Sequence, residues 1–311
     1  MKFSLKKMLL ASSIATVMML SACTNSEETE EENKNATNDN DVEDYGEEIN
    51  YTITGIEPGA GITLATDKAI EEYDNLEGWT QEESSTAAMT AELDKAIKNE
   101  EPIVITGWVP HWKFIKHPTM KFLDDPKEVY GSEEKLHTLV KIGLEEEKPE
   151  AFKLIDQFKW DAEDMETIMF ESKESGDEID EVSKRWVADN EDKVSEWTKD
   201  VADVDSIEIE FAATPWDSDR AASEVLKEVM EQKGFDVKIT TVDVAIVFQS
   251  VATGDADVTL GAELPITHKD FYDKHEDDIV DLGPNLEGAK IGLVVPEYMD
   301  IDSIEDLKPK Q

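Results

Sequence analysis

The chain has 311 residues, with 74 acidic and 30 basic side chains and a formal net charge of −44. This length allows two compact domains with buried cores. The charge excludes nucleic acid and polyanionic partners, because like charges repel. Acidic residues occur along the whole sequence, so we interpret them as a hydrated surface suited to high salt and expect a salt-loving or salt-tolerant source.

The N-terminus has the pattern of a targeting segment. Three lysines accompany an apolar run over residues 8–20, which is too short and ends too abruptly to be a stable membrane span. The run ends in the string LSAC, which contains the only cysteine, Cys23, and resembles a bacterial lipobox. We therefore expect a signal peptide over residues 1–22 and lipidation of Cys23. A lone cysteine also excludes a disulfide, a cysteine metal cluster and a Cys-His nucleophile from the body.

Residues 23–48 are almost free of apolar side chains and densely acidic. Such a composition cannot bury enough surface to fold. We predict a flexible tether between a lipid anchor and the folded body.

The body opens with a candidate anion site. The string TITGIEPGAGI reads as a short strand, a Gly/Pro turn and a helix start, which leaves the backbone N–H groups of Gly61 and Ile62 facing outward. A buried strand over residues 102–107 then leads to Trp108. An anion-binding helix start and an aromatic side chain, each following a strand, indicate a receptor for a small zwitterion.

Helices are predicted over residues 63–73 and 84–99, followed by a mixed connector over residues 113–130. The chain from Ser132 to about Lys199 is predicted to be helical in four segments. Four tryptophans are interpreted as structural anchors: Trp79, Trp160, Trp186 and Trp197.

A second α/β pattern begins at Ile207, where apolar residues alternate and lead to Trp216 at the strand end. Helices and strands then alternate up to the string AELPITH, which contains Glu263 and His268. A last strand over residues 291–295 is expected to return to the first half, before a terminal helix. Two α/β halves, each with Gly, Trp and Pro at its strand ends, therefore predict two lobes that face a ligand cleft.

Several strings, in this order, resemble one family: GIEPGAGI, ITGWVPHWKF, KFLDDP, EEKLHT, VATGDAD, ELPITH and IGLVVPEYM. The chain resembles the substrate-binding lipoproteins of glycine betaine/proline betaine ABC importers, of the OpuA type in Gram-positive bacteria, over residues 50–310. The resemblance implies a type II periplasmic-binding-protein fold, an α/β architecture whose two lobes close on the ligand. The expected divisions are lobe A at 49–115 plus about 297–311, lobe B at 116–296, its helical segment at 132–200 and its α/β part at 206–290.

The family binds a quaternary ammonium in a prism of three tryptophans and the carboxylate through two backbone amides and a histidine. Carried over by the resemblance, the amides belong to Gly61 and Ile62, and the first two prism walls are Trp108 and Trp216. The carboxylate histidine is His268, and Glu263 stands where the third tryptophan belongs. That set, Gly61, Ile62, Trp108, Trp216, Glu263 and His268, is the predicted ligand site.

The departure at Glu263 leaves two alternatives open. In one, Glu263 faces the ligand and favours ectoine, carnitine or an amino acid, since a carboxylate accepts hydrogen bonds that a quaternary amine cannot donate. In the other, Glu263 points away, Phe248 or Phe271 fills the gap, and betaine still binds. Trp112 either packs in the core or hinge, or backs the cage. A cap of the following helix is expected among Asp217, Ser218 and Asp219, and Asp217 is alternatively a hydrogen-bond acceptor behind the cage.

The resemblance implies a receptor on the outer face of the cytoplasmic membrane, anchored through Cys23, that passes a compatible solute to permease and ATPase subunits. We expect a monomer without metal or cofactor. No motif of an enzyme class is present, so an enzyme is not expected. A surface sensor without a transporter remains the other class. The hinges are predicted near residues 113–120 and 291–298.

Overall fold

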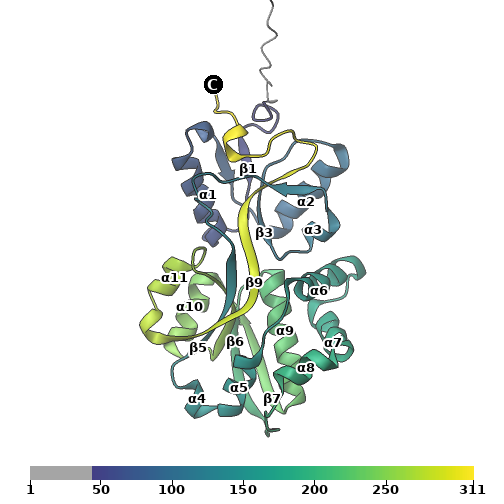
Figure 1. The fold of residues 1–311 in the computed structure, drawn as a ribbon, viewed down its shortest axis with the longest axis vertical. Helices are drawn as coiled ribbons and strands as arrows, with labels where there is room; N and C mark the ends of the chain where they lie inside the picture. The colour runs from purple at the N-terminus through teal and green to yellow at the C-terminus, as the bar shows by residue number, and fades with distance from the viewer. Residues whose placement is uncertain (1–43) are drawn as a thin grey trace, which may run out of the picture. The chain divides into compact units, whose positions relative to one another are not determined.

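One long strand, β9 (Ile279–Pro296), is shared by the two halves of the fold in the computed structural model, which describes residues 44–311. Figure 1 shows this strand running from the lower half to the upper half of the protein. The nine-stranded sheet has the order β2-β1-β3-β9-β5-β8-β6-β7, and β4 also pairs with β9. The expected signal peptide, Cys23 and most of the expected tether lie outside the described residues.

The first half is an α/β layer built on parallel strands. Ser85 begins its second helix by accepting a hydrogen bond from Ala88 N at 3.1 Å, which satisfies one of the free N–H groups of the first turn. The elements of this half are β1 (Thr52–Thr54), α1 (Gly61–Glu72), β2 (Thr80–Glu82), α2 (Thr86–Asn99), β3 (Ile105–Val109), α3 (Lys113–Lys116) and β4 (Met120–Phe122).

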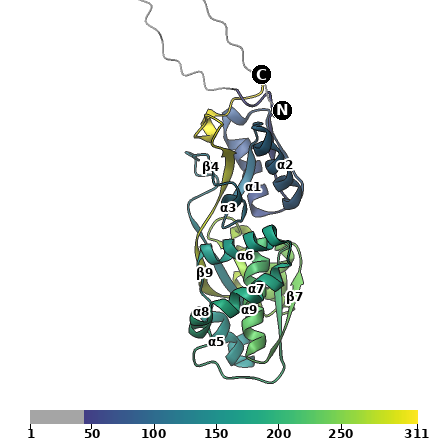
Figure 2. The same cartoon turned by 90° about the vertical axis from the view of Figure 1, so that its right-hand side faces the viewer.

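The second half combines a helical layer with the other end of the sheet. Figure 2 shows α6 to α9 gathered on one side of this half. Its elements are β5 (Glu134–Lys141), α4 (Leu144–Glu147), α5 (Pro149–Gln157), α6 (Ala162–Ser175), α7 (Ile179–Asp189), α8 (Glu191–Trp197), β6 (Ile207–Ala213), α9 (Asp217–Gln232), β7 (Phe235–Thr241), α10 (Val244–Thr253), β8 (Val258–Leu264) and α11 (Lys269–Asp273). Short 3-10 turns lie at Asp74–Leu76, Glu276–Asp278 and Ile304–Asp306.

The prediction that the chain is helical from Ser132 was wrong for its first part. Residues Glu134–Lys141 form β5, a central strand that pairs antiparallel with both β8 and β9. Leu136 and Val140 are buried in the second half's core and alternate with polar neighbours, as in a strand. The helical segments begin only at α4. The predicted terminal helix is also limited to the short turn Ile304–Asp306.

Two separate main cores give the fold its two lobes, so the predicted two-lobed α/β architecture is confirmed. One core joins the first half to the end of β9, and the other joins β5 and β8 to α5, α6, α7 and α9. All four tryptophans expected to be anchors are buried in these cores: Trp79, Trp160, Trp186 and Trp197.

The core clusters favour lobe boundaries different from those expected. Tyr130 belongs to the first core and Leu136 to the second, and on the return Ala289 belongs to the second and Ile291 to the first. The predicted hinge segments, 113–120 and 291–298, lie mainly with the first core, where Met120 pairs with Pro296. The chain therefore crosses between the lobes near 131–135 and 289–290. The expected lobe limits remain a prediction, with these crossings as their proposed revision.

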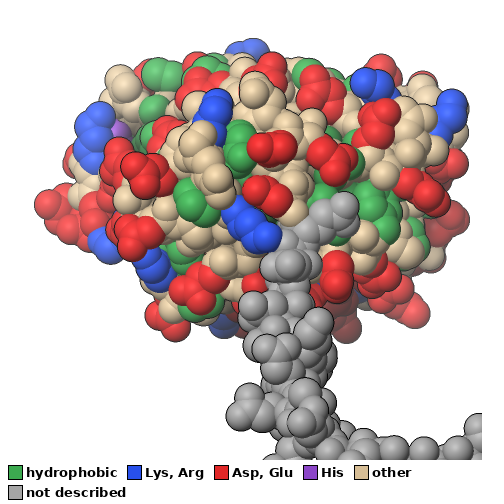
Figure 3. All heavy atoms as spheres, turned by 90° about the horizontal axis from the view of Figure 1, so that it is seen from above, with side chains coloured by type: hydrophobic (Ala, Val, Ile, Leu, Met, Phe, Trp, Pro, Cys, Tyr) green, Lys and Arg blue, Asp and Glu red, His purple; other side chains and the backbone are tan. Residues whose placement is uncertain are grey.

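The folded body begins earlier than the expected end of the tether at residue 48. Tyr45 is buried in the first core, and its hydroxyl accepts a hydrogen bond from Asp300 N at 3.0 Å. Among the described residues, no helix has both the length and the apolar character needed to cross a membrane. Acidic side chains are spread over the face seen in Figure 3, with lysines and arginines between them.

Candidate ligand-binding site

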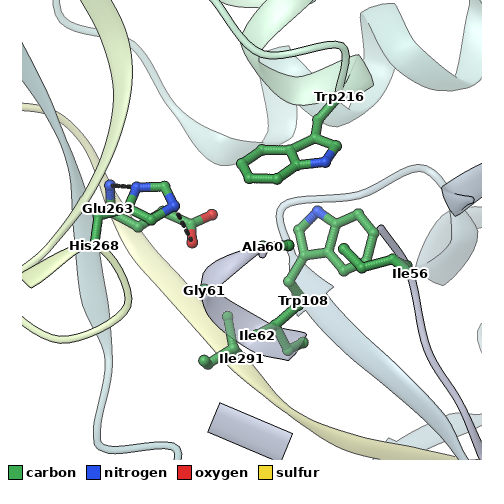
Figure 4. Close-up of a pocket in the computed structure, with 9 residues that line it drawn as sticks. All are labelled: Ile56, Ala60, Gly61, Ile62, Trp108, Trp216, Glu263, His268 and Ile291. Atoms are coloured by element: carbon green, nitrogen blue, oxygen red, sulfur yellow. Dashed lines mark hydrogen bonds and ion pairs between the residues drawn. The ribbon is translucent and has the colours of Figure 1, made fainter. Parts of the chain in front are cut away.

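A small cavity lies where the start of α1 and the end of β3 face the end of β8 and the start of α9. Its space outside the atoms is about 280 Å³, which includes open solvent at its mouth. All six residues predicted for the ligand site line it (Figure 4). The lining also contains three residues that sequence reasoning missed: Ile56, Ala60 and Ile291.

The N-terminus of α1 supplies free backbone donors at this cavity. Ala60 occupies the N-cap position and provides no side-chain acceptor, so the first N–H groups of this 12-residue helix lack the usual cap. Gly61 and Ile62 are the first two helical residues, and both line the cavity. Backbone N–H groups at a helix start, reinforced by the helix dipole, favour an anion such as a carboxylate.

His268 adds a side-chain donor beside this helix start. Its Nδ1 accepts a hydrogen bond from Glu263 N at 2.9 Å, which places the proton of the neutral ring on Nε2. Nε2 is buried and has no hydrogen-bond partner, and the ring lines the cavity. Burial lowers the pKa of His268 to about 3, so the ring is neutral near pH 7. A buried N–H without a partner is ready to bind a ligand oxygen.

Two tryptophans from different lobes form the aromatic walls. Trp108 lies at the end of β3, where it pairs with Ile291 of β9, and Trp216 immediately precedes α9. Trp216 also stacks on the His268 ring, with centroids 6.0 Å apart and planes at 17°. Figure 4 shows both indole rings beside the same cavity. Such rings attract a cation by about 0.5–2 kcal/mol each.

A buried lysine contacts Trp108 away from the cavity. Lys113 Nζ lies 3.6 Å from the centroid of the indole and donates to Trp108 O at 3.2 Å. Its side chain is fully buried and does not line the cavity, so the amine occupies one side of the ring. Burial lowers the pKa of Lys113 well below its usual range. Sequence reasoning did not single out this residue.

Glu263 faces the cavity, as Figure 4 shows, and its Oε2 lies 3.9 Å from His268 Nε2. This separation is too long for a hydrogen bond. Burial, together with the negative charges of Glu134 and Asp219, raises the pKa of Glu263 to about 8. Both groups are therefore mainly neutral at pH 7, and they are not an ion pair there.

The two carboxyl groups near Glu263 have structural partners of their own. Glu134 Oε1 accepts hydrogen bonds from Ile266 N at 2.7 Å and Thr267 N at 2.8 Å. Asp219 Oδ2 accepts from Thr214 N at 2.7 Å, and burial raises the pKa of Asp219 to about 6. Residues 44–311 contain no group of three or more His, Cys, Asp or Glu side chains arranged to hold a metal ion.

The structure does not adopt the alternative in which Glu263 points away from the ligand site. Phe248 and Phe271 pack against the His268 ring at 5.8 Å and 6.1 Å between centroids, but neither lines the cavity. They support the histidine and do not replace the missing wall. One side of the predicted cage is therefore a carboxyl group.

The expectation that Asp217, Ser218 and Asp219 provide the cap of α9 was wrong, because the N-cap residue is Trp216 and no side chain caps the helix. Asp217 is the first residue of the helix, and its Oδ2 accepts a hydrogen bond from Trp112 Nε1 at 3.0 Å. Trp112 belongs to the first half of the chain but is buried in the second core. It does not line the cavity, so its role is packing and contact between the lobes.

A two-lobed α/β fold with a cavity of this kind between its lobes defines a solute-binding protein. The family model described as the substrate binding domain of the ABC-type glycine betaine transport system matches residues 27–189 and 207–311. The chain therefore belongs to this family of transporter substrate-binding proteins. It is 49% identical to the glycine betaine/carnitine transport binding protein GbuC of Listeria monocytogenes over 267 residues, which cover 85% of this chain and 88% of the relative.

Solved structures of similar proteins match parts of the chain. The crystal structure of lactococcal OpuAC, closed and complexed with glycine betaine, is 42% identical, with a TM-score of 0.45, over 49% of this chain and 59% of that chain. The glycine betaine, L-proline-binding protein ProX of Borrelia burgdorferi is 30% identical, with a TM-score of 0.47, over 50% of this chain and 58% of that chain. The chain thus spans less than two thirds of either structure in these matches.

Proposed function

We propose that this protein is the extracytoplasmic receptor that binds a compatible solute, with glycine betaine as the reference ligand, and delivers it to an ABC importer for osmoprotection. One observation carries the proposal. The helix start at Gly61 and Ile62 and the unpartnered Nε2 of His268 meet in the same small cavity as Trp108 and Trp216. A zwitterion with a carboxylate at one end and a cationic nitrogen at the other matches this arrangement.

Binding is proposed to close the lobes. Gly61, Ile62 and Trp108 belong to one lobe, whereas Trp216 and His268 belong to the other, so a ligand that contacts both stabilises the closed form. Saturating ligand should then reduce the radius of gyration measured by small-angle scattering. An unchanged radius of gyration with saturated sites would contradict closure on binding.

The ligand is best identified with a thermal-shift screen of glycine betaine, proline betaine, carnitine, choline, ectoine and amino acids. A tight ligand raises the melting temperature by mass action. Calorimetry then measures affinity, and Trp108→Ala and Trp216→Ala should each weaken it by roughly 2- to 30-fold, since one cation–aromatic contact is worth about 0.5–2 kcal/mol. Unaltered affinity in both variants would rule out the aromatic cage.

The alternative ligands that bear N–H groups, such as ectoine or an amino acid, belong to the same screen. When its carboxyl group is ionised, Glu263 can accept a hydrogen bond from the N–H groups of these ligands. Comparing wild type with Glu263→Trp separates the cases. If the screen favours betaine and Glu263→Trp strengthens its binding, the site is a betaine cage with one wall removed. If an N–H ligand binds best and loses affinity in Glu263→Trp, Glu263 selects that ligand.

We also propose a location and partners for this receptor. We expect a monomer anchored by lipid at Cys23 to the outer face of the cytoplasmic membrane, working with permease and ATPase subunits and without enzymatic turnover. Cys23→Ser should release the protein from the membrane fraction. Ligand recovered unchanged after prolonged incubation would agree with a receptor, whereas conversion of the solute would not. Transport that requires this protein in vesicles with its permease would separate importer delivery from a sensor.

A further inference from the structure

The Glu263 carboxyl group lies beside the position where a solute carboxylate would bind. Its Oε2 is 3.9 Å from His268 Nε2. Among the described residues that line the cavity, this nitrogen is the one buried side-chain donor without a hydrogen-bond partner. A ligand oxygen that accepts from Nε2 at about 2.8 Å would therefore lie within about 7 Å of Oε2. Two ionised carboxylates at this separation repel each other strongly in a buried site.

The groups around Glu263 cannot neutralise its charge. From β5 it faces Glu134, and from α9 it faces Asp219, both acidic. From the loop before α11 it faces His268, which burial keeps neutral. The lining residues of the first lobe do not titrate, and Lys113 is separated from the cavity by Trp108. An ionised Glu263 would thus be a buried charge with no cation beside it until a cationic ligand enters.

A protonated Glu263 behaves in the opposite way toward a carboxylate. Its O–H can donate a hydrogen bond to the ligand and adds to the donors at Gly61, Ile62 and His268. An ionised Glu263 can only accept, and it attracts a cation that brings no carboxylate.

We infer that protonation of Glu263 selects the class of ligand: the protonated form accepts a carboxylate-bearing zwitterion, and the ionised form favours a quaternary ammonium without a carboxylate. This inference rests on the proposed function and says which class of ligand that same site binds. The raised pKa of Glu263, about 8, puts the change in the mildly alkaline range. Asp219 titrates lower, near 6, so the two events are separated in pH.

Glycine betaine and choline are suitable probes because both carry a trimethylammonium group and neither titrates between pH 7 and 9.5. Calorimetry over this range should show the dissociation constant of betaine rising by roughly tenfold per pH unit above the transition, as for any ligand that requires one bound proton. The dissociation constant of choline should fall over the same range. In Glu263→Gln, which keeps a neutral side chain of similar size, both constants should be independent of pH.

Glu287→Gln serves as the matched control, since Glu287 is an exposed carboxylate of β9 that pairs with Lys135. It should keep the pH dependence of the wild type, and melting temperatures at each pH report whether every variant stays folded. A constant betaine affinity from pH 7 to 9.5 in the wild type would overturn the inference and leave the proposed function intact. Opposite slopes that persist in Glu263→Gln would also overturn it. If the folded wild type bound neither probe at any pH, the inference and glycine betaine as the ligand would both be overturned, and the receptor function would rest on the N–H ligands of the thermal-shift screen.

Discussion

Gly61 at the start of α1 lies directly against Thr267 of the opposite lobe. A β-carbon added to Gly61 would stand 2.6 Å from Thr267 O and closer still to its Cγ2 methyl. Real β-carbons essentially never approach backbone oxygen this closely, so only glycine fits here in this arrangement of the lobes. The residue that offers an N–H to the cavity is therefore also the residue that lets the lobes meet.

Replacing Gly61 by alanine should weaken ligand binding by roughly 10–100-fold, because overpacking costs about 1–3 kcal/mol and is felt only when the lobes close. The melting temperature without ligand should change little. Calorimetry with betaine and thermal unfolding check the two parts.

Gly59→Ala is the control in the same turn. Gly59 has φ +83° and nothing within 4 Å of an added β-carbon, so alanine there strains the backbone without obstructing the cavity. It should lower stability by about 1–2 kcal/mol and leave affinity unchanged. Equal affinity losses in Gly59→Ala and Gly61→Ala would contradict steric obstruction at Thr267.

The hydrogen bond from Trp112 Nε1 to Asp217, at 3.0 Å, joins the segment after β3 to the start of α9. Trp112→Phe removes the donor and keeps an aromatic ring. Hydrogen bonds to charged groups contribute about 1.5–3 kcal/mol, so we expect roughly 10–100-fold weaker binding, measured by calorimetry.

Trp197→Phe removes a comparable bond that lies within one lobe, from Trp197 Nε1 to Lys159 O at 2.8 Å. This variant should have a lower melting temperature and unchanged affinity. If Trp112→Phe binds as tightly as wild type, the Trp112–Asp217 contact does not favour closure.

Glu134 fixes the loop that carries His268. Besides its two backbone bonds to Ile266 and Thr267, it accepts from the Thr267 hydroxyl. Glu134→Ala leaves these three donors without their acceptor and should reduce the free energy of unfolding by at least about 3 kcal/mol, since each unsatisfied buried group costs about 1–3 kcal/mol. Urea unfolding measures this, and betaine affinity should fall as His268 loses its support.

Glu134→Gln retains one acceptor oxygen and should lie between wild type and Glu134→Ala in both measurements. A fully stable Glu134→Ala would show that the loop holds its conformation by other contacts.

Lys113 should make stability depend on pH. Its pKa is lowered in the folded chain because the side chain is fully buried, whereas the unfolded chain has the ordinary value of 10.5. Between the two values the unfolded state binds the extra proton, so stability due to this group rises with pH, by up to about 1.4 kcal/mol per unit. Lys113→Met should be more stable than wild type near pH 7, and the difference should shrink toward pH 10.

Thermal unfolding from pH 7 to 10 measures this difference. Lys68→Met, at an exposed position of α1, is the control and should follow the wild-type curve. A Lys113→Met variant whose curve runs parallel to wild type would indicate that Lys113 stays protonated beside Trp108.

The helix starts and most strands could be predicted from local pattern. The α1 start, the strand at Ile207 and the helix that ends at Gly254 follow from turn residues and apolar periodicity, which act over a few neighbours. Strand β5 was missed because it lies beside a long helical region and its alternation is short. The strand is decided by pairing with β8 and β9, far away in the sequence.

The sequence by itself determined which side chains could form the site, through the strings that carry Gly61, Trp108, Trp216 and His268 and through the family they resemble. Only the tertiary structure decided that Glu263 faces the cavity among Glu134, Asp219 and His268, because burial and charge depend on residues that the fold brings together from separate elements. It also decided the close approach of Gly61 and Thr267. These relationships depend on distances across two lobes, which local sequence pattern does not contain.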